Sequence, residues 1–335
     1  MSSWRRCHNG WNQRRIRWSD KGMGRTLTFT AAADEFVQGF SPDNIEVTLL
    51  MKGGDDVVNL NRDDDFGGGN NVDAGTGKDT VVNRDENGSQ IVLGDGDDQY
   101  LGLGFGSFSA DRPDTVRAGK GNDLIAVATF KSRYLGEAGN DQFFSVGWAN
   151  TFIGGAGRDT ISYEPRDEDF SQGGSGVTVD LAAGRTQTGA NRFETISQIE
   201  NVVGCGADDA IFGNNGANRL TGGRGFDQLT GRGGADTFIW GAGNEAPVSA
   251  SSIDLVTDFS RNQGDRLDLS GIDANSRVGG DQAFTFIATS PFSGQAGQLQ
   301  FADDILSGDT NGDRRADFRI GLINVTGLIA ADIVL

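Results

Sequence analysis

Residues 154–162 read Gly-Gly-Ala-Gly-Arg-Asp-Thr-Ile-Ser, with glycine at positions one, two and four, aspartate at six and isoleucine at eight. This segment matches the repeat G-G-x-G-x-D-x-U-x, in which U is apolar. Two further copies follow at residues 222–230 and 231–239, and the second of them places one glycine differently. Each unit predicts a loop followed by a short strand, and stacked units form a solenoid that no single repeat sustains.

The period of nine extends beyond these copies. In a first block, position six reads Asp114, Asp123, Ser132, Asp141, Asn150 and Asp159, and position eight reads Val116, Ile125, Tyr134, Phe143, Phe152 and Ile161. In a second block, position six reads Asp209, Asn218, Asp227 and Asp236, and position eight reads Ile211, Leu220, Leu229 and Phe238. Upstream the pattern is less regular, with Asp56, Asp79 and Asp98 in similar loops. A disordered acidic segment would not keep position eight apolar, so disorder is the weaker interpretation.

The residue types of the loop favour a hard cation. Glycine adopts positive φ and lets backbone come close, so a short loop can curl and direct its carbonyls inward. Calcium prefers six to eight oxygen ligands in flexible geometry, and aspartate adds an anionic one. The candidate calcium ligands are Asp79, Asp98, Asp123, Gly136, Asp141, Gly154, Gly155, Gly157, Asp159, Asp209, Asn218, Gly222, Gly223, Gly225, Asp227, Gly231, Gly233 and Asp236.

The first block predicts calcium on one side only, if one turn of the solenoid holds two repeats. The loops that end at Asp123, Asp141 and Asp159 all contain glycine. The loops on the other side end at Asp114, Ser132 and Asn150, and they contain a single glycine and a proline. In the second block Asp209 and Asp227 alternate with Asn218 and Asp236, so both sides are expected to bind calcium.

Composition narrows the function classes. The chain has 335 residues, 52 of them glycine, and only 36% are hydrophobic, so an ordinary packed core is doubtful and something else must help to hold the fold. The net charge of −18 argues against nucleic acid or anionic lipid as partners and favours cations. The two cysteines, Cys7 and Cys205, make no disulfide framework, and His8 alone supplies no HExxH motif.

The N-terminal 25 residues are basic and contain no repeat, so we expect a disordered leader, with Met23 as an alternative start. No apolar stretch follows the arginines, and a cleavable signal peptide is therefore not predicted. No segment approaches the ~20 apolar residues of a membrane helix.

Over residues 50–335 the repeats resemble those of the RTX family of calcium-binding proteins, which leave the cell by type I secretion. The resemblance implies an all-β fold: a parallel β-roll in two blocks, with calcium between loops on the same side. It also implies a type I ABC exporter as a partner and an extracellular location. We expect a degenerate roll at 26–165, a connecting insertion at 166–203 and a second block at 204–240.

Residues 241–335 lose the period and read as strands separated by turns. Together with the junction Gly234-Ala235-Asp236-Thr237-Phe238, they resemble the C-terminal domain of serralysin-type secreted metallopeptidases. The ending at residues 328–335 is similar to the uncleaved export signal of that family, and a buried last strand is a compatible interpretation. Asp309–Asp317 resembles the front half of a D-x-N-x-D calcium loop but has Arg314 at the turn and Ile320 at position twelve, so calcium and a plain acidic turn both stay open.

The leading hypothesis is a non-enzymatic secreted protein that folds when it binds extracellular calcium. Aspartates stacked ~4.8 Å apart would repel by roughly 3 kcal/mol per pair at a dielectric constant of ~20, so the ion-free roll is expected to be largely unfolded. One alternative is a pore-forming protein that uses residues 101–108. Another is adhesion to an extracellular glycan or host surface, with Phe130 and Trp148 as stacking platforms.

Overall fold

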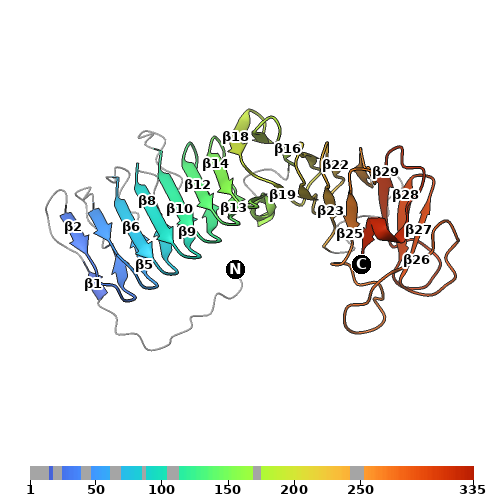
Figure 1. Cartoon of the computed structure of the whole chain (residues 1–335), viewed down its shortest axis with the longest axis horizontal. Coiled ribbons are helices and arrows are strands. Elements are labelled where there is room, and N and C mark those ends of the chain that lie inside the picture. Colours follow the sequence, from blue (N-terminus) through green and yellow to red (C-terminus); the bar gives the residue numbers. More distant parts are fainter. Residues whose placement is uncertain are drawn as a thin grey trace. The chain divides into compact units, whose positions relative to one another are not determined.

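The structure is a computed structural model that describes residues 15–17, 25–38, 47–60, 69–84, 88–103, 113–168, 175–241 and 253–335. Its regular structure is almost entirely β, and the chain forms two compact units, residues 1–135 and 136–335. Parallel strands stack along both units (Figure 1). The predicted all-β parallel roll is confirmed.

The N-terminal unit contains two parallel sheets. The first sheet holds β1 (Arg15–Arg17), β3 (Glu35–Val37), β5 (Val57–Leu60), β7 (Thr80–Asn83), β9 (Gln99–Gly102) and β11 (Leu124–Val127). The second sheet holds β2 (Arg25–Thr28), β4 (Val47–Leu50), β6 (Asn71–Thr76), β8 (Gln90–Asp95) and β10 (Thr115–Lys120). The next strand, β12 (Arg133–Ala138), begins in this unit and ends in the following one. The chain alternates between the two sheets, as a β-roll requires.

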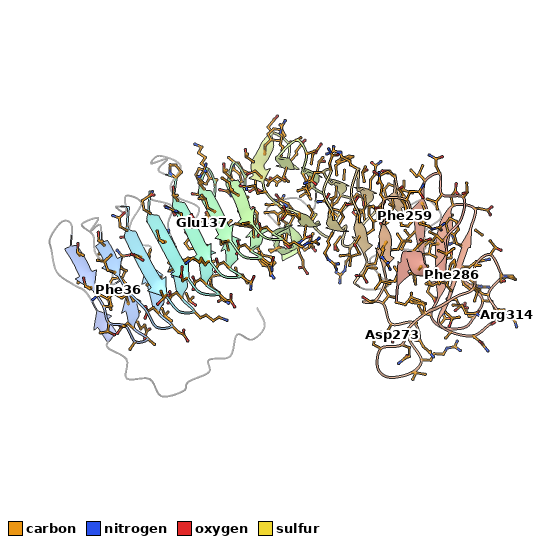
Figure 2. The ribbon with its side chains drawn as sticks, in the orientation of Figure 1. Phe36, Glu137, Phe259, Asp273, Phe286 and Arg314 are labelled. Atoms are coloured by element: carbon orange, nitrogen blue, oxygen red, sulfur yellow. The ribbon has the colours of Figure 1, made fainter. Side chains whose placement is uncertain are left out.

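Position eight of each repeat forms the core of this unit. Val58, Val81, Tyr100 and Ile125 follow one another in register along the first sheet, and none is exposed to solvent. Phe36 continues the row on β3 (Figure 2). The aspartates that precede these strands are joined in a ladder, in which the backbone N–H of one donates to the carboxylate of the next. Along the chain, the spacings between Asp56, Asp79, Asp98 and Asp123 are 23, 19 and 25 residues. The nine-residue period frays upstream because the loops vary in length while the strands keep their register.

The C-terminal unit also has two sheets. Its first sheet holds β13 (Gln142–Ser145), β15 (Thr160–Ser162), β19 (Asn201–Val203), β21 (Arg219–Thr221), β23 (Thr237–Ile239), β25 (Arg266–Asp268) and β30 (Ile333–Val334). Its second sheet includes β14 (Thr151–Ala156), β20 (Ala210–Phe212), β22 (Gln228–Thr230) and β24 (Asp254–Val256). Here the ladder spacing between Asp141 and Asp159 is the predicted 18 residues.

The insertion adds strands to the second sheet. After the 3-10 helix η1 (Glu164–Glu168), β16 (Thr178–Asp180), β17 (Arg185–Gly189) and β18 (Arg192–Ser197) form an antiparallel meander. Its outer strands rejoin the roll, since β18 pairs in parallel with β14 and β16 with β20. The insertion therefore continues the sheet, as expected of a structural spacer.

The C-terminal segment ends the solenoid with an antiparallel meander. It contains β26 (Thr285–Phe286), β27 (Gln298–Ala302), β28 (Ile305–Asp309) and β29 (Phe318–Leu322), and β29 pairs in parallel with β24. After η3 (Ala330–Asp332), β30 closes the first sheet, with Ile333 opposite Leu267. The last residues thus form a strand whose Ile333 is buried.

One expectation for the N-terminus is corrected. Residues before Thr26 were expected to lack structure, yet Arg15–Arg17 form β1, with Ile16 opposite Phe36 in parallel register. Backbone pairing to an open sheet edge needs no repeat motif, which is why the sequence pattern missed it. The expectations for Cys7, His8 and Met23 concern residues outside those that the structure describes.

Candidate calcium-binding loops

We call the loops that lead from the second sheet to the first sheet the first loop row. In the N-terminal unit they end at Asp34, Asp56, Asp79, Asp98 and Asp123. In the C-terminal unit they end at Asp141, Asp159, Glu200, Asn218, Asp236 and Asp265. Each backbone N–H in the N-terminal series donates to Oδ1 of the next aspartate, at 2.6 to 2.8 Å. One carboxylate oxygen per turn is thereby fixed in place.

In three of these aspartates the second carboxylate oxygen has no donor. Oδ2 of Asp56, Asp79 and Asp98 is buried and accepts no hydrogen bond. Burial raises the pKa of these carboxyls to about 6, 7 and 6, respectively, and the neighbouring aspartates add to the shift. A buried, oriented and unpaired carboxylate oxygen is costly unless a cation meets it. Calcium would fit this requirement, because it prefers oxygen ligands.

Position one of the repeat shows why glycine is required. A Cβ on Gly136 would meet Oδ2 of Asp141 and the carbonyl oxygen of Gly154, and a Cβ on Gly154 would meet Oδ2 of Asp159 and the carbonyl oxygen of Gln198. The missing side chain therefore leaves a space bordered by oxygens. At positions two and four, Gly155 and Gly157 have φ of 122° and 146°. This donor set fits calcium, which takes carboxylate and carbonyl oxygens together.

Side chains alone do not complete any such site. Among the described residues, no group of three or more histidine, cysteine, aspartate or glutamate side chains could hold a metal. Calcium bound at these loops would therefore need backbone carbonyl oxygens as further ligands, such as those of Gly154 and Gln198.

The second block contains the same space bordered by oxygens, which we call the cradle, on both sides of the roll. Gly222 with Asp227 and Gly231 with Asp236 repeat the contact between position one and Oδ2. Oδ2 of both aspartates is buried without a donor, and burial raises their pKa to about 8 and about 7. Gly223 and Gly225 adopt φ of 102° and 131°, as their positions predict.

Three predicted ligands of the second block lie in different surroundings. Both carboxylate oxygens of Asp209 already accept backbone N–H groups, from Val177 and Cys205, each at 2.6 Å. Oδ1 of Asn218 accepts from Asn214 and its amide donates to Glu200. Gly233 has no close neighbour, because a Cβ there would first meet Asn215 at 3.5 Å. These positions match the repeat in sequence but lack the unpaired oxygen of the others.

We call the loops that lead from the first sheet to the second sheet the second loop row. In the N-terminal unit they end at Asn70, Ser89, Asp114 and Ser132. Oδ1 of Asp114 accepts from the backbone of Gly88 and Ser89, and Oδ2 accepts from Asn83 at 2.8 Å. Protein donors thus supply what the first row lacks, which supports the one-sided prediction. Residues 109–112 of one loop lie outside the described part.

The ends of the ladders are residues that the repeat pattern did not identify. Oδ2 of Asp34 accepts from Thr30, Asp254 accepts from the Trp240 indole at 2.8 Å, and Asp265 accepts from Ser260. Each ladder end is therefore closed by a local donor. Asp34 and Asp265 lie directly before a strand and Asp254 is the first residue of β24, and only this position could have revealed them.

In the Asp309–Asp317 turn, the carboxylates of Asp309 and Asp317 accept hydrogen bonds from other residues of the same turn. Asp309 accepts from Asn311, Gly312 and Arg314, and Asp317 accepts from Thr310 and Asn311. Arg314 adopts φ of 72° at the turn. These contacts favour the acidic turn over a calcium loop.

The candidate stacking platforms are covered. Phe130 is 9% exposed, and the Arg192 guanidinium lies 4.5 Å from the centre of the Trp148 ring. For the proposed pore segment, residues 104–108 lie outside the described part. No helix among the described residues is long and apolar enough to cross a membrane.

A buried carboxyl lies inside the C-terminal unit, on β18 of the insertion. Glu194 accepts hydrogen bonds from Ser145 at 2.8 Å, Tyr163 at 3.0 Å and Asn150 at 3.2 Å. Burial raises the pKa of Glu194 to about 7. Because Glu194 is enclosed, we assign it a structural role in joining the insertion to the roll.

Comparison with known families supports both halves of this description. Residues 194–335 match the peptidase M10 serralysin C-terminal family. Residues 110–126 and 149–162 match the RTX calcium-binding nonapeptide repeat. These matches include no catalytic protease domain. A comparison with curated proteins finds no match.

Proposed function

We propose that this type I secreted protein, which carries RTX calcium-binding repeats ahead of a serralysin C-terminal domain, is a non-enzymatic module that folds on binding extracellular calcium. The observation that carries the proposal is the first loop row. Its aspartates present buried oxygens that no protein donor meets, as at Asp56, Asp79 and Asp98. Folding without a cation would leave each of these carboxyls desolvated beside its neighbour.

Calcium concentration then sets the folded population. Without calcium, adjacent aspartates about 4.8 Å apart repel by roughly 3 kcal/mol at a dielectric constant of about 20. Each ion that binds only the folded state adds RT ln(1 + [L]/Kd) of stability. Extracellular calcium modules bind with Kd of about 10⁻⁴ to 10⁻³ M. The chain would stay extended in the cytosol and fold outside the cell.

The C-terminal end is consistent with export before folding. In the folded chain β30 pairs with β25, and Asp332 forms an ion pair with Arg261 at 2.5 Å. An exporter that recognises these last residues must therefore bind them before β30 pairs with β25. We propose a type I ABC exporter as the partner at that stage.

The proposal assigns no reaction to the chain. We propose the domain bounds expected from the sequence, which are a leader at 1–25 that contributes β1, a roll at 26–165, an insertion at 166–203, a second block at 204–240 and an export domain at 241–335. The adhesion alternative is less favoured because Phe130 is buried and Trp148 is covered by Arg192. Binding to a glycan or host surface would have to use another face.

Circular dichroism during a calcium titration tests the proposal. The full chain in excess EGTA should lack the native β signal and gain it cooperatively as calcium reaches the millimolar range. Magnesium at the same concentrations is the control, because it demands octahedral geometry and dehydrates reluctantly. A native β signal in EGTA that calcium leaves unchanged would contradict the proposal.

A further inference from the structure

Arg232 occupies an unusual position in the second block. It is position two of the repeat at 231–239, where the other full copies have Gly155 and Gly223. Its φ of 69° lies in the left-handed region that residues with a Cβ rarely adopt. Glu137, at position two of the loop 136–141, has φ of 76° and shares this conformation, so it is the contacts of the Arg232 side chain that set Arg232 apart.

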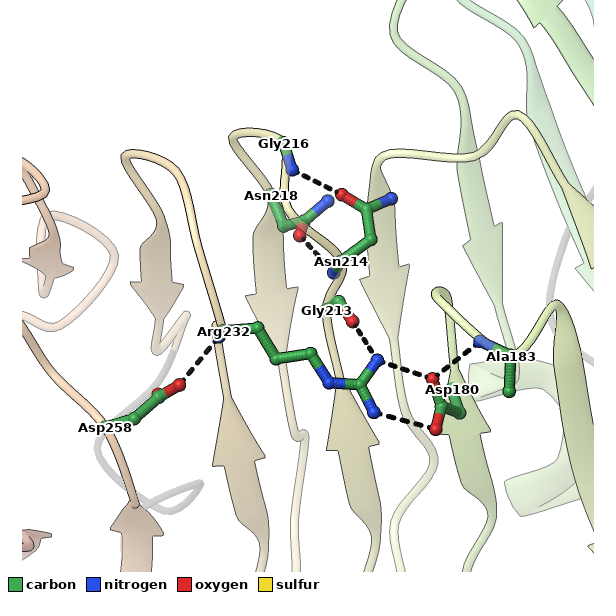
Figure 3. A network of polar contacts seen from close by, with 8 residues as sticks. All are labelled: Asp180, Ala183, Gly213, Asn214, Gly216, Asn218, Arg232 and Asp258. Carbon is green, nitrogen blue, oxygen red and sulfur yellow. Dashed lines mark hydrogen bonds and ion pairs between the residues drawn. The ribbon is translucent and has the colours of Figure 1, made fainter.

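The guanidinium of Arg232 reaches back along the roll (Figure 3). It donates to both carboxylate oxygens of Asp180, at 2.6 and 2.8 Å, and to the carbonyl oxygen of Gly213 at 2.6 Å. Asp258 fixes the backbone, since it accepts from the N–H groups of Gly231 and Arg232 at 2.9 and 2.7 Å. Both charged side chains are about 30% exposed, at 32% for Arg232 and 28% for Asp180.

The place that the guanidinium fills is one where the first loop row is interrupted. Gly213 begins the loop 213–218, and its strand β20 pairs with β16. In a regular roll the strand below would continue into another loop of the same row. Here β16 turns instead into the hairpin with β17, and Asp180 and Ala183 lie at that turn. On this side of the Gly213 carbonyl lies the Asp180 carboxylate, in the place where a regular roll would have the glycine loop of the preceding turn.

The ion pair of Arg232 with Asp180 is neutral as a unit, and among the described residues Asp258 hydrogen-bonds only to backbone N–H groups. The residue at position six of the loop is the neutral Asn218, which accepts from Asn214 within its own loop. The Arg232 hydrogen bonds lower the pKa of Asp180, and the Asp180 hydrogen bonds raise the pKa of Arg232. One guanidinium thus meets one carboxylate and one carbonyl, which are oxygen types that calcium takes in the regular loops.

We propose that Arg232 is a built-in cation that takes the place of calcium where the insertion interrupts the first loop row. This inference rests on the proposed function, because it presumes that the regular loops bind calcium. In the first loop row, the second block would then begin on the loop 213–218, which needs no ion, and calcium would be added only at the following loops. The consensus glycine at position two is absent here because the side chain itself supplies the charge.

Bound calcium per chain and melting temperature test this inference in the full-length protein. Arg232→Gly leaves Asp180 and the Gly213 carbonyl without a cation. We expect it to bind one more calcium ion per chain at millimolar calcium, measured by equilibrium dialysis with elemental analysis. We also expect its melting temperature to fall further below wild type at low calcium than at saturating calcium. Arg232→Gln, which removes the charge but keeps most of the side chain, should show the same calcium dependence.

Arg219→Gln is the matched control for Arg232→Gln, because Arg219 is a half-exposed arginine of the same block that lies on β21 and outside the loops. It removes the same charge and should bind as many ions as wild type. An unchanged ion count in Arg232→Gly, with a melting difference independent of calcium, would overturn the inference. If wild type itself bound no calcium, the proposed function would fail instead, so the two failures are distinguishable. If Arg232→Gly does not fold, Arg232→Gln decides between the outcomes.

Discussion

In both loop rows of the N-terminal unit, a polar side chain accepts a backbone hydrogen bond from the neighbouring loop. The rows differ in whether the remaining carboxylate oxygens find a donor within the protein. In the first row, Asp79 holds the backbone N–H of Asp56 with one oxygen and leaves the other bare. In the second row, Ser89 accepts from Asn70 at 3.1 Å, and Asp114 has both oxygens occupied by protein donors. In the second row the protein itself supplies the hydrogen-bond donors, whereas in the first row a buried oxygen is left that needs a cation.

This difference teaches that calcium dependence belongs to individual loops and not to the fold, and that in the N-terminal unit the loops with an unpaired oxygen lie in the first row. Both rows stack parallel strands and align a polar side chain at the end of each loop. What differs is whether the second oxygen has a donor, and whether glycine leaves room beside it. The following predictions test that distinction, from the largest expected effect to the smallest.

Ion occupancy should show an all-or-none contrast between rows. We expect calcium at the loops that end at Asp123, Asp141 and Asp159, and none at those that end at Asp114, Ser132 and Asn150. Anomalous diffraction from crystals grown with calcium measures this directly. Full ions in both rows of residues 109–159 would remove the distinction.

A matched pair of substitutions should separate ion binding from stability. Asp79→Asn removes a buried anion, so we expect fewer calcium ions per chain at saturation and a calcium midpoint raised by roughly tenfold per 1.4 kcal/mol of lost binding. Ser89→Ala removes the acceptor for the Asn70 N–H, which costs about 1–3 kcal/mol of stability. Its ion count at saturation should equal that of wild type.

Equilibrium dialysis and thermal melts on both variants provide the measurement. The comparison fails if Ser89→Ala loses bound ions, or if Asp79→Asn keeps them all. The first result would mean that the second row also holds ions, and the second would mean that the Asp79 carboxylate is not needed to hold one.

The buried Glu194 allows a pH test of how the second row is satisfied, because it accepts from Asn150. Burial raises its pKa from 4.5 to about 7 in the folded chain, against the opposing hydrogen bonds from Ser145, Tyr163 and Asn150. The folded state therefore retains a proton that the unfolded chain releases. This contribution is fully present below pH 4.5 and is lost as the pH rises through about 7.

Glu194→Gln should abolish this contribution. The difference in unfolding free energy between wild type and variant should change by about 3 kcal/mol between pH 4 and pH 8, with wild type relatively weaker at the higher pH. Urea denaturation in saturating calcium at several pH values measures it, and the ladder carboxyls contribute equally to both proteins. A pH-independent difference would show that Glu194 is already ionised or solvated in the fold.

Much of this arrangement is predictable from the sequence. Position eight identified buried residues such as Tyr134 and Phe143, and glycine beside aspartate identified the cradles at Asp159, Asp227 and Asp236. The surroundings of Asp209 were not predictable, because its donor Val177 lies 32 residues away beyond the insertion. Likewise, Asn83 satisfies Asp114 across 31 residues. Local patterns show which oxygens are present, whereas distant donors decide which of them remain free.

The smallest effect is expected at the N-terminal edge. A chain that starts at Met23 loses β1, which is three residues long and pairs only with β3 among the described strands. A backbone hydrogen bond contributes about 1 kcal/mol net, and a domain of this size shifts its melting temperature by about 2–4 °C per kcal/mol. We therefore expect melting a few degrees lower, with an unchanged number of bound calcium ions, because Asp34 already has Thr30 as its donor. Calorimetry and dialysis on both chains measure this. A loss of ions on truncation would mean that the first loop row extends into the leader, and its end would then have to be placed before Asp34.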